Sequence, residues 1–218
     1  METDRKWIVV RVDGKLAGIS QDYGRLAEIA AGIDLEYKSH RKPKKGRSRE
    51  EQQTLPYGEV TAQAVTFEEV MRLKTSARWE DLMLFGTDFQ KRVWKTLWDL
   101  SSLPAGHEDS RANEDAPENK ARLLSYSDFA DLCRNRAGVR AVAHAIALNP
   151  LPVVIPCHLI VPKEAIDRIR EIQRKAEDTI FKGEDLCHTS ILNDNAIDFG
   201  EYALGRELKR RLISMDLG

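Results

Sequence analysis

Residues 153–162, VVIPCHLIVP, place a thiol beside an imidazole at the end of an apolar run. A cysteine reacts as its thiolate, so a neighbouring group that accepts the proton turns it into a nucleophile. Cys157 next to His158 could therefore be a reactive centre. A buried cysteine that only fills the core fits the same run, and these residues alone leave both interpretations open.

The other cysteines indicate no further chemistry. The chain holds 3 cysteines, an odd number without a CxxC pair, which argues against a disulfide framework and a zinc ribbon. Cys187 precedes His188, but no partner stands at metal-ligand spacing, so we expect no metal site. We interpret Cys133 as buried filler and Cys187 as a loop residue.

Composition and charge exclude some classes of protein. The chain has 218 residues, 42% of them hydrophobic, and a formal net charge of -1, so no global basic field indicates a nucleic-acid partner. A DNA-binding protein nevertheless needs only a local basic face. No apolar stretch approaches the roughly 20 residues of a membrane span, and the first residues lack a signal-peptide core. We expect no membrane association and a soluble intracellular protein, cytoplasmic or, in a eukaryote, nuclear.

The start of the chain predicts a β-hairpin followed by a helix. A strand over Trp7–Val12, a turn at Asp13–Gly14 and a second strand that ends near Ile19 are typical of a hairpin. A helix follows over Tyr23–Ala31. The basic run Lys38–Glu50, KSHRKPKKGRSRE, predicts a solvated linker, with a phosphate-contacting arm as the alternative.

A strand and a capped helix complete the N-terminal part. Residues 58–74, GEVTAQAVTFEEVMRLK, predict a strand and then a helix that begins after Thr66, with Glu69 completing a capping box. We therefore expect a small mixed α/β domain over residues 1–82.

The remaining residues, 83–218, predict a mostly helical domain. Thr87 is a suitable N-cap for a helix, and the polar stretch Gly106–Arg122 predicts a loop. The stretch Lys163–Asp198 predicts a helix in its first half, and a last helix is expected over about Leu204–Met215. Four apolar residues should form the buried face of the helix after Thr87: Phe89, Val93, Leu97 and Leu100.

Two short helices in this domain are candidates for a helix-turn-helix. Ser125 should cap a helix over Tyr126–Leu132, and a turn leads into a second helix over Gly138–Leu148. The second helix is rich in alanine and carries Arg140 in its first turn. Small side chains allow close approach to another surface, but an alanine-rich helix packed against a neighbour has the same pattern.

Together these motifs resemble a known family, the O6-alkylguanine-DNA alkyltransferases, also called methylated-DNA–protein-cysteine methyltransferases. The resemblance covers roughly Gly86–Asp216, and its motifs follow the family's order. They are GTDFQKRVWKTL, LPAG, SYSDFA, VRAVAHAIALNPLPVVIPCHLIV and GEYALGRELKRRLI. The family implies an α/β (α+β) protein with a winged-helix-like helix-turn-helix in its C-terminal domain.

The resemblance also implies a reaction. The family binds the DNA minor groove, turns the damaged guanine out of the stack and moves its O6-alkyl group irreversibly to a cysteine. We therefore expect a single-turnover monomer that acts on double-stranded DNA containing O6-alkylguanine and uses no cofactor.

Matching positions suggest a relay at the reactive thiol. Cys157 matches the nucleophile, and His158 matches the base that acts through a water. Asp216 stands where the family usually has a glutamate that orients the imidazole, one methylene shorter. Asn149 matches the residue that braces the turn before the cysteine.

Other matching positions surround the flipped base. Tyr126 and Lys209 match groups that donate to the guanine, and Tyr202 matches the ring that lines the pocket. Arg140 matches the arginine that replaces the flipped base in the stack, while the small Ala143 suits close packing in the minor groove. His144 on the same helix either contacts a phosphate or faces solvent. Backbone groups near two residues match those that bind the base edges: Ile160 and Ala203.

Three departures distinguish this chain from the family pattern. Leu159 replaces the usual arginine after the histidine, and insertions lengthen Gly106–Arg122 and Lys163–Asp198. Two rival functions remain open. One is an alkyltransferase-like protein that binds lesions without transfer, although such proteins typically replace the cysteine. The other is a thiol hydrolase, which would leave Arg140 and its alanine-rich helix without an evident purpose.

Overall fold

The computed structural model describes residues 6–40, 59–102, 123–180 and 197–217. These residues form a mixed α+β protein, as the sequence predicts. The chain divides into two compact units, Met1–Arg92 with Leu148–Ile155, and Val93–Ala147 with Pro156–Gly218. The predicted boundary after residue 82 stays a prediction. No helix among the described residues is long and apolar enough to cross a membrane.

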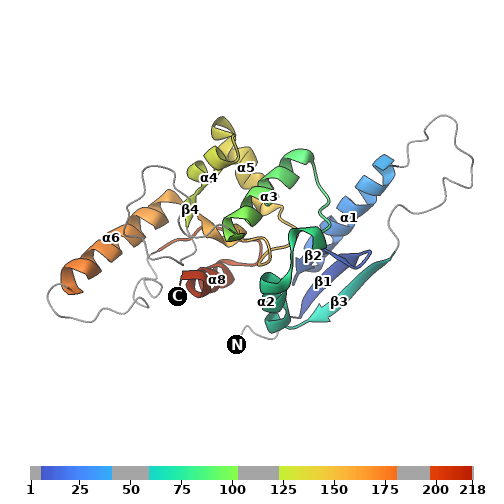
Figure 1. Cartoon of the computed structure of the whole chain (residues 1–218), viewed down its shortest axis with the longest axis horizontal. Helices are drawn as coiled ribbons and strands as arrows, with labels where there is room; N and C mark the ends of the chain where they lie inside the picture. Colours follow the sequence, from blue (N-terminus) through green and yellow to red (C-terminus); the bar gives the residue numbers. More distant parts are fainter. Residues whose placement is uncertain (1–5, 41–58, 103–122, 181–196, 218) are drawn as a thin grey trace, which may run out of the picture. The chain divides into compact units, whose positions relative to one another are not determined.

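The first unit contains a three-stranded antiparallel sheet in the order β2-β1-β3 (Figure 1). Its strands are β1 (Trp7–Val12), β2 (Lys15–Ser20) and β3 (Val60–Val65). Asp13 and Gly14 join β1 to β2 with φ angles of 51° and 76°. Positive φ at both positions is typical of a type I′ turn, which matches the twist of the flanking strands. The predicted hairpin is confirmed.

Helix α1 (Tyr23–His40) packs on this sheet. It continues beyond the predicted end at Ala31 and includes the first residues of the basic run. Ile29 and Ile33 lie one turn apart in a cluster with residues of β1 and β2, so packing outweighs the low helix propensity of Gly32. Residues 41–50, the remainder of the predicted linker, lie outside the described residues.

Local capping signals set the starts of the next helices. Helix α2 (Phe67–Ser76) begins after Thr66, whose hydroxyl accepts from Glu69 N, while the Glu69 carboxylate accepts from Thr66 N at 2.7 Å. The short η1 (Trp79–Asp81) follows. Helix α3 (Asp88–Ser102) begins after Thr87, whose hydroxyl accepts from Gln90 N. Both predicted caps are confirmed.

The buried side of α3 differs in part from the prediction. Val93 and Leu97 are fully buried, as expected, whereas Phe89 and Leu100 are only half-buried. Trp94 is buried as well, and its indole Nε1 donates to Ala145 O at 2.8 Å. The indole therefore ties α3 to the second helix of the predicted pair.

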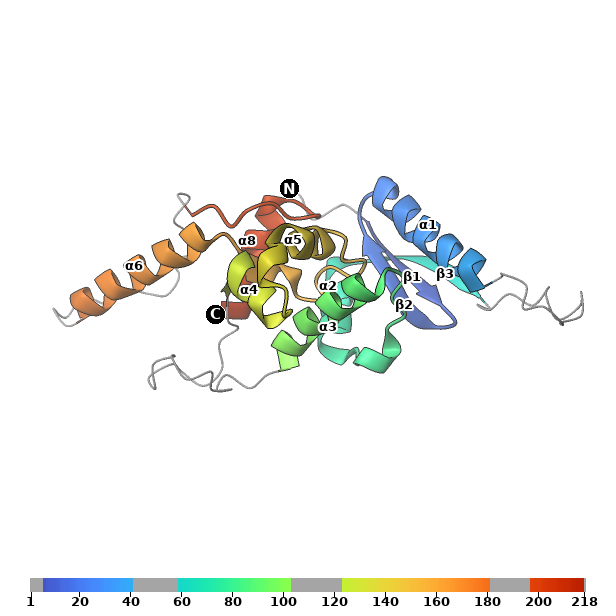
Figure 2. The same cartoon turned by 90° about the horizontal axis from the view of Figure 1, so that it is seen from above.

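The predicted helix pair forms with almost the expected bounds. Ser125 caps α4 (Tyr126–Leu132) by accepting from Asp128 N, and α5 (Val139–Ala147) packs against α4 (Figure 2). The turn between them contains the short η2 (Arg136–Gly138). Its DNA-binding role stays a prediction.

The rest of the second unit surrounds the predicted nucleophile. Strand β4 (Leu124–Ser125) pairs in parallel with β5 (Ile160–Val161), which follows η3 (Cys157–Leu159). Helix α6 (Lys163–Ile180) confirms the helix expected in the first half of the longer insertion, and α8 (Arg206–Leu217) is the last helix. Cys187 and the insertion Gly106–Arg122 lie outside the described residues.

Candidate active site

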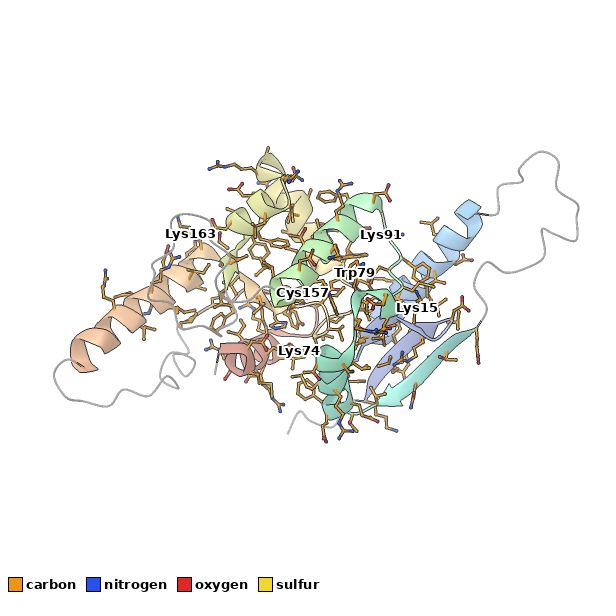
Figure 3. All side chains as sticks on the ribbon, in the orientation of Figure 1. Lys15, Lys74, Trp79, Lys91, Cys157 and Lys163 are labelled. Atoms are coloured by element: carbon orange, nitrogen blue, oxygen red, sulfur yellow. The ribbon has the colours of Figure 1, made fainter. Side chains whose placement is uncertain are left out.

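Cys157 opens the short helix η3, after Pro156 ends the apolar run. Figure 3 labels it among the side chains of the interior, and only 5% of its surface is exposed. The thiol is not part of a disulfide. A thiol buried on this short turn presents its sulfur to the groups that line the site rather than to bulk water.

His158 forms a close pair with an aspartate of α8. Its Nε2 lies 2.8 Å from Asp216 Oδ2, with the imidazole fully buried and the carboxylate side chain 15% exposed. The ring of Tyr202 stands edge-on to the imidazole, with ring centroids 6.4 Å apart. The structure therefore brings together three of the sequence-predicted residues, and the shorter aspartate does reach the histidine.

Lys209 bonds to two backbone carbonyls near the candidate site. Its side chain is almost completely buried, and its ammonium donates to Ile160 O at 2.8 Å and to Glu201 O at 3.4 Å. A buried charge must find such partners. The structure thus brings together two of the sequence-predicted groups, Lys209 and the backbone at Ile160. Their contact with a guanine stays a prediction.

Burial shifts the pKa values of Lys209 and Tyr126 in the direction that favours their neutral forms. Burial lowers the pKa of Lys209 to about 8, although the negative charges of Cys157, Asp198 and Glu201 oppose the shift. Burial raises the pKa of Tyr126, and the negative charges of Cys157 and Glu201 add to the increase. Tyr126 therefore keeps its phenol proton near neutral pH and can act as a donor.

The lowered pKa of Lys209 predicts a pH-dependent stability. Between about 8 and 10.5 the unfolded chain holds a proton that the native protein has released, so the free energy of unfolding rises with pH. The Lys209→Met variant lacks the titrating group. We therefore expect the difference in free energy of unfolding, parent protein minus variant, to rise by about 1 kcal/mol per pH unit in this window. Urea unfolding of both proteins at several pH values measures it. A constant difference would mean that the two carbonyls hold the pKa near its usual value.

Asn149 braces the segment before the cysteine, as the sequence predicts. It is buried in the first unit, donates to Ile155 O at 3.0 Å and accepts from Leu151 N at 3.0 Å. Val153 within this brace has a φ of 77°, a left-handed conformation that costs a β-branched residue about 1–2 kcal/mol. The amide therefore fixes a strained turn that leads directly to the nucleophile.

The N-terminal unit also holds this segment, which the sequence did not reveal. Arg25 of α1 donates through Nη2 to Asn149 O at 3.1 Å, and Ile19 N of β2 donates to Pro150 O at 2.8 Å. An arginine on a helix normally indicates a solvated face. No sequence signal distinguishes Arg25 from such a residue, because its partner lies far along the chain.

Helix α5 presents a small and basic face. Its buried side holds Val142, Ala145 and Ile146, while Arg140 and His144 are exposed and Ala143 is half-buried. The exposed fraction of Arg140 agrees with a residue that reaches a ligand, but its insertion into a base stack stays a prediction.

The structure also shows how deeply three other residues singled out in the sequence are buried. Ala203 is exposed, whereas Leu159 is buried, with 3% of its surface accessible. A buried leucine after the histidine occupies interior space where an arginine would need a charged partner. Cys133, expected to be buried, is half-buried, and partial burial raises the pKa of its thiol.

Comparison with known proteins gives partial matches. Residues 119–177 match the family model described as 6-O-methylguanine DNA methyltransferase, DNA binding domain. A probable methylated-DNA–protein-cysteine methyltransferase of Acanthamoeba polyphaga mimivirus is 36% identical over 83 residues, 38% of this chain and 44% of that protein. A methylated-DNA–protein-cysteine methyltransferase of Kluyveromyces lactis is 37% identical over 36% of this chain and 32% of that protein. The matched part therefore spans less than half the length of these relatives.

A solved structure resembles the whole chain only loosely. The O6-methylguanine-DNA methyltransferase of Pyrococcus kodakaraensis aligns with 98% of this chain and 93% of its own, at 19% identity and a TM-score of 0.45.

Proposed function

We propose that this protein repairs alkylated DNA by moving an alkyl group from guanine O6 to Cys157, since residues 119–177 match the family model of the DNA-binding domain of 6-O-methylguanine DNA methyltransferase. The observation that carries the proposal is the contact between His158 Nε2 and Asp216 Oδ2, which lie 2.8 Å apart. His158 directly follows Cys157 in the sequence. A thiol, an imidazole and a carboxylate in this order can generate a thiolate.

The chemistry begins with the proton of the thiol. His158 accepts it through a water, and Asp216 stabilises the resulting imidazolium. The sulfur then attacks the alkyl carbon, a carbon–sulfur bond forms and the bond from that carbon to guanine O6 breaks. The electron pair of the broken bond stays on the base. Tyr126 donates its phenol proton to the base, and the imidazolium of His158 gives up its proton through water to restore the phenol. In the net reaction the thiol loses one proton and the guanine gains one.

The product determines the stoichiometry. A thioether on Cys157 is chemically stable, and the step releases no free thiol, so each molecule reacts once. No redox change occurs, and the residues of the site account for both the proton and the alkyl group. We infer that double-stranded DNA carrying the lesion is the partner and that the small, basic face of α5 lies against the minor groove.

Mass spectrometry tests the proposal directly. After incubation with a duplex that contains O6-methylguanine, we expect one added methyl group, about 14 Da, on the peptide that carries Cys157. Cys157→Ala should gain nothing. Cys133→Ala, which removes the other described thiol, should still gain one methyl group.

A second outcome would favour lesion binding without transfer. If the protein binds the alkylated duplex more tightly than the unmodified duplex but its mass does not change, the transfer proposal is wrong. The presence of a cysteine next to a histidine that is itself bonded to Asp216 favours transfer.

A further inference from the structure

The segment Ile197–Tyr202, here called the return segment, brings the chain back from the longer insertion to the candidate site. Two of its side chains are buried in an apolar cluster, with 2% of Ile197 and 4% of Phe199 exposed. The first turns of α6 supply much of the rest of this cluster. Its buried members are Val161, Ala165, Ile166, Ile169, Ile197, Phe199 and Ile213.

Two consecutive basic residues of α8 hold the same segment through its backbone. Arg210 donates from Nη2 to Ile197 O at 2.6 Å, and its guanidinium carbon lies 4.9 Å from the centroid of the Phe199 ring. Lys209 donates to Glu201 O, closer to Tyr202. A guanidinium that bonds a carbonyl and stacks on a ring fixes both the backbone and a side chain.

A glycine fixes the middle of the return segment. Gly200 has a φ of 79°, and a Cβ at this position would lie 3.1 Å from Pro162, the residue after β5. Its N–H donates to Asp198 Oδ1 at 2.9 Å. The return segment is therefore held by α8 at its start and near its end, and an internal hydrogen bond fixes the turn at its centre.

We propose that Arg210, together with the apolar side of α6, positions the return segment so that Tyr202 stands edge-on to His158 before the substrate binds. The insertion that contains α6 thus supplies side chains that support the return segment beside the candidate site. Arg210 is a positioning residue, because it acts through Phe199 and Ile197 rather than on the alkyl group. The effect on alkyl transfer rests on the proposed function; the effect on access to the thiol does not.

Loosening the return segment has two opposite consequences. A substrate must then order the segment on binding, so its apparent affinity falls by the fraction of time that the segment is in place. The return segment reaches the site through Tyr202, whose ring stands edge-on to His158, the neighbour of Cys157. We therefore expect its loosening to raise the access of small reagents to Cys157, of which only 5% is exposed in the structure. A variant that only lowers global stability can raise labelling through complete unfolding, but it leaves the rate of transfer by the folded protein unchanged, so a change in both values indicates a loosened segment.

The test compares Arg210→Leu with Arg211→Leu, which removes an exposed arginine from the next position of the same helix. In Arg210→Leu we expect iodoacetamide to label the Cys157 peptide about tenfold faster. We expect the second-order rate of transfer from free O6-benzylguanine to fall about tenfold, with a smaller change at saturation. Arg211→Leu should match the parent protein in both values, and Arg210→Lys should lie between.

Each outcome decides one of the two proposals. Unchanged labelling and unchanged transfer in folded Arg210→Leu would overturn the positioning role. If the parent protein takes neither a benzyl group from the free base nor a methyl group from the alkylated duplex, but Arg210→Leu still labels faster, the positioning role stands and the proposed function fails. Should Arg210→Leu not fold, Ile169→Val, which removes one methylene from the same cluster, gives the second measurement. We expect a smaller increase in labelling there, and no increase would contradict the proposal.

Discussion

We expect the replacement of His158 with glutamine to lower the rate of the proposed transfer from O6-benzylguanine to Cys157 by about 10²- to 10⁴-fold, the usual contribution of a general base. Glutamine fills similar space and can still bond to Asp216, but it cannot accept the thiol proton. Single-turnover kinetics, followed by the mass of the protein, measure the rate. The free base is used because its reaction does not depend on DNA binding.

A variant of Asp216, the carboxylate that bonds to His158, gives a second test of the same role. A carboxylate 2.8 Å from Nε2 favours the tautomer with a proton on that nitrogen and leaves Nδ1 as the acceptor. Asp216→Asn should therefore lower the rate as well, whereas Glu207→Gln, which changes an exposed acid of the same helix, should not. A His158→Gln protein that reacts at the parent rate would show that the thiolate forms without the imidazole.

Asn149→Ala lowers the free energy of unfolding by about 2–4 kcal/mol, because it leaves a buried carbonyl and a buried N–H without their partner. The groups concerned are Ile155 O and Leu151 N, each 3.0 Å from the amide. Loss of the brace also allows Val153 to leave its left-handed conformation. Urea unfolding followed by tryptophan fluorescence measures the change.

An exposed amide provides the control. Gln63→Ala on β3 removes a side chain that is exposed to solvent, and its effect should stay within about 0.5 kcal/mol. If Asn149→Ala is as stable as Gln63→Ala, the two hydrogen bonds of Asn149 do not fix the segment, and another group must hold the turn before Cys157.

The sequence predicts those parts of the fold that depend on neighbours along the chain. Thr66 and Glu69 form a capping box three residues apart, and Asp13–Gly14 closes the hairpin by its own backbone preferences. Both signals are complete within a few residues, so no tertiary contact is needed to interpret them.

Features that depend on distant partners are not visible in the sequence. Helix α1 continues past Gly32 because Ile33 packs against apolar residues of the sheet. Lys209 resembles a pocket residue in the motif, yet its ammonium bonds the backbone of Ile160, 49 residues away. In the candidate site, residue types could be predicted from the motif, but the partner of each polar atom could not, because burial decides which atoms must pair.

Arg210 was missed for the same reason. In the motif GRELKRRLI it stands beside the exposed Arg211, and the sequence does not distinguish the arginine that bonds Ile197 O from its neighbour. The helical period alone assigns both to the polar side of α8.

The stretch Leu148–Ile155 belongs to the first unit, although the chain on either side of it belongs to the second. The chain therefore passes between the two units twice here, after α5 and again before Pro156. A fragment that begins at Val93 would keep Cys157 and α5 but lose Ile19 and Arg25, which bond to the backbone of this stretch. The N-terminal part is accordingly not a separable domain. Any truncation that removes it also removes the hydrogen bonds that hold the connection between α5 and Cys157.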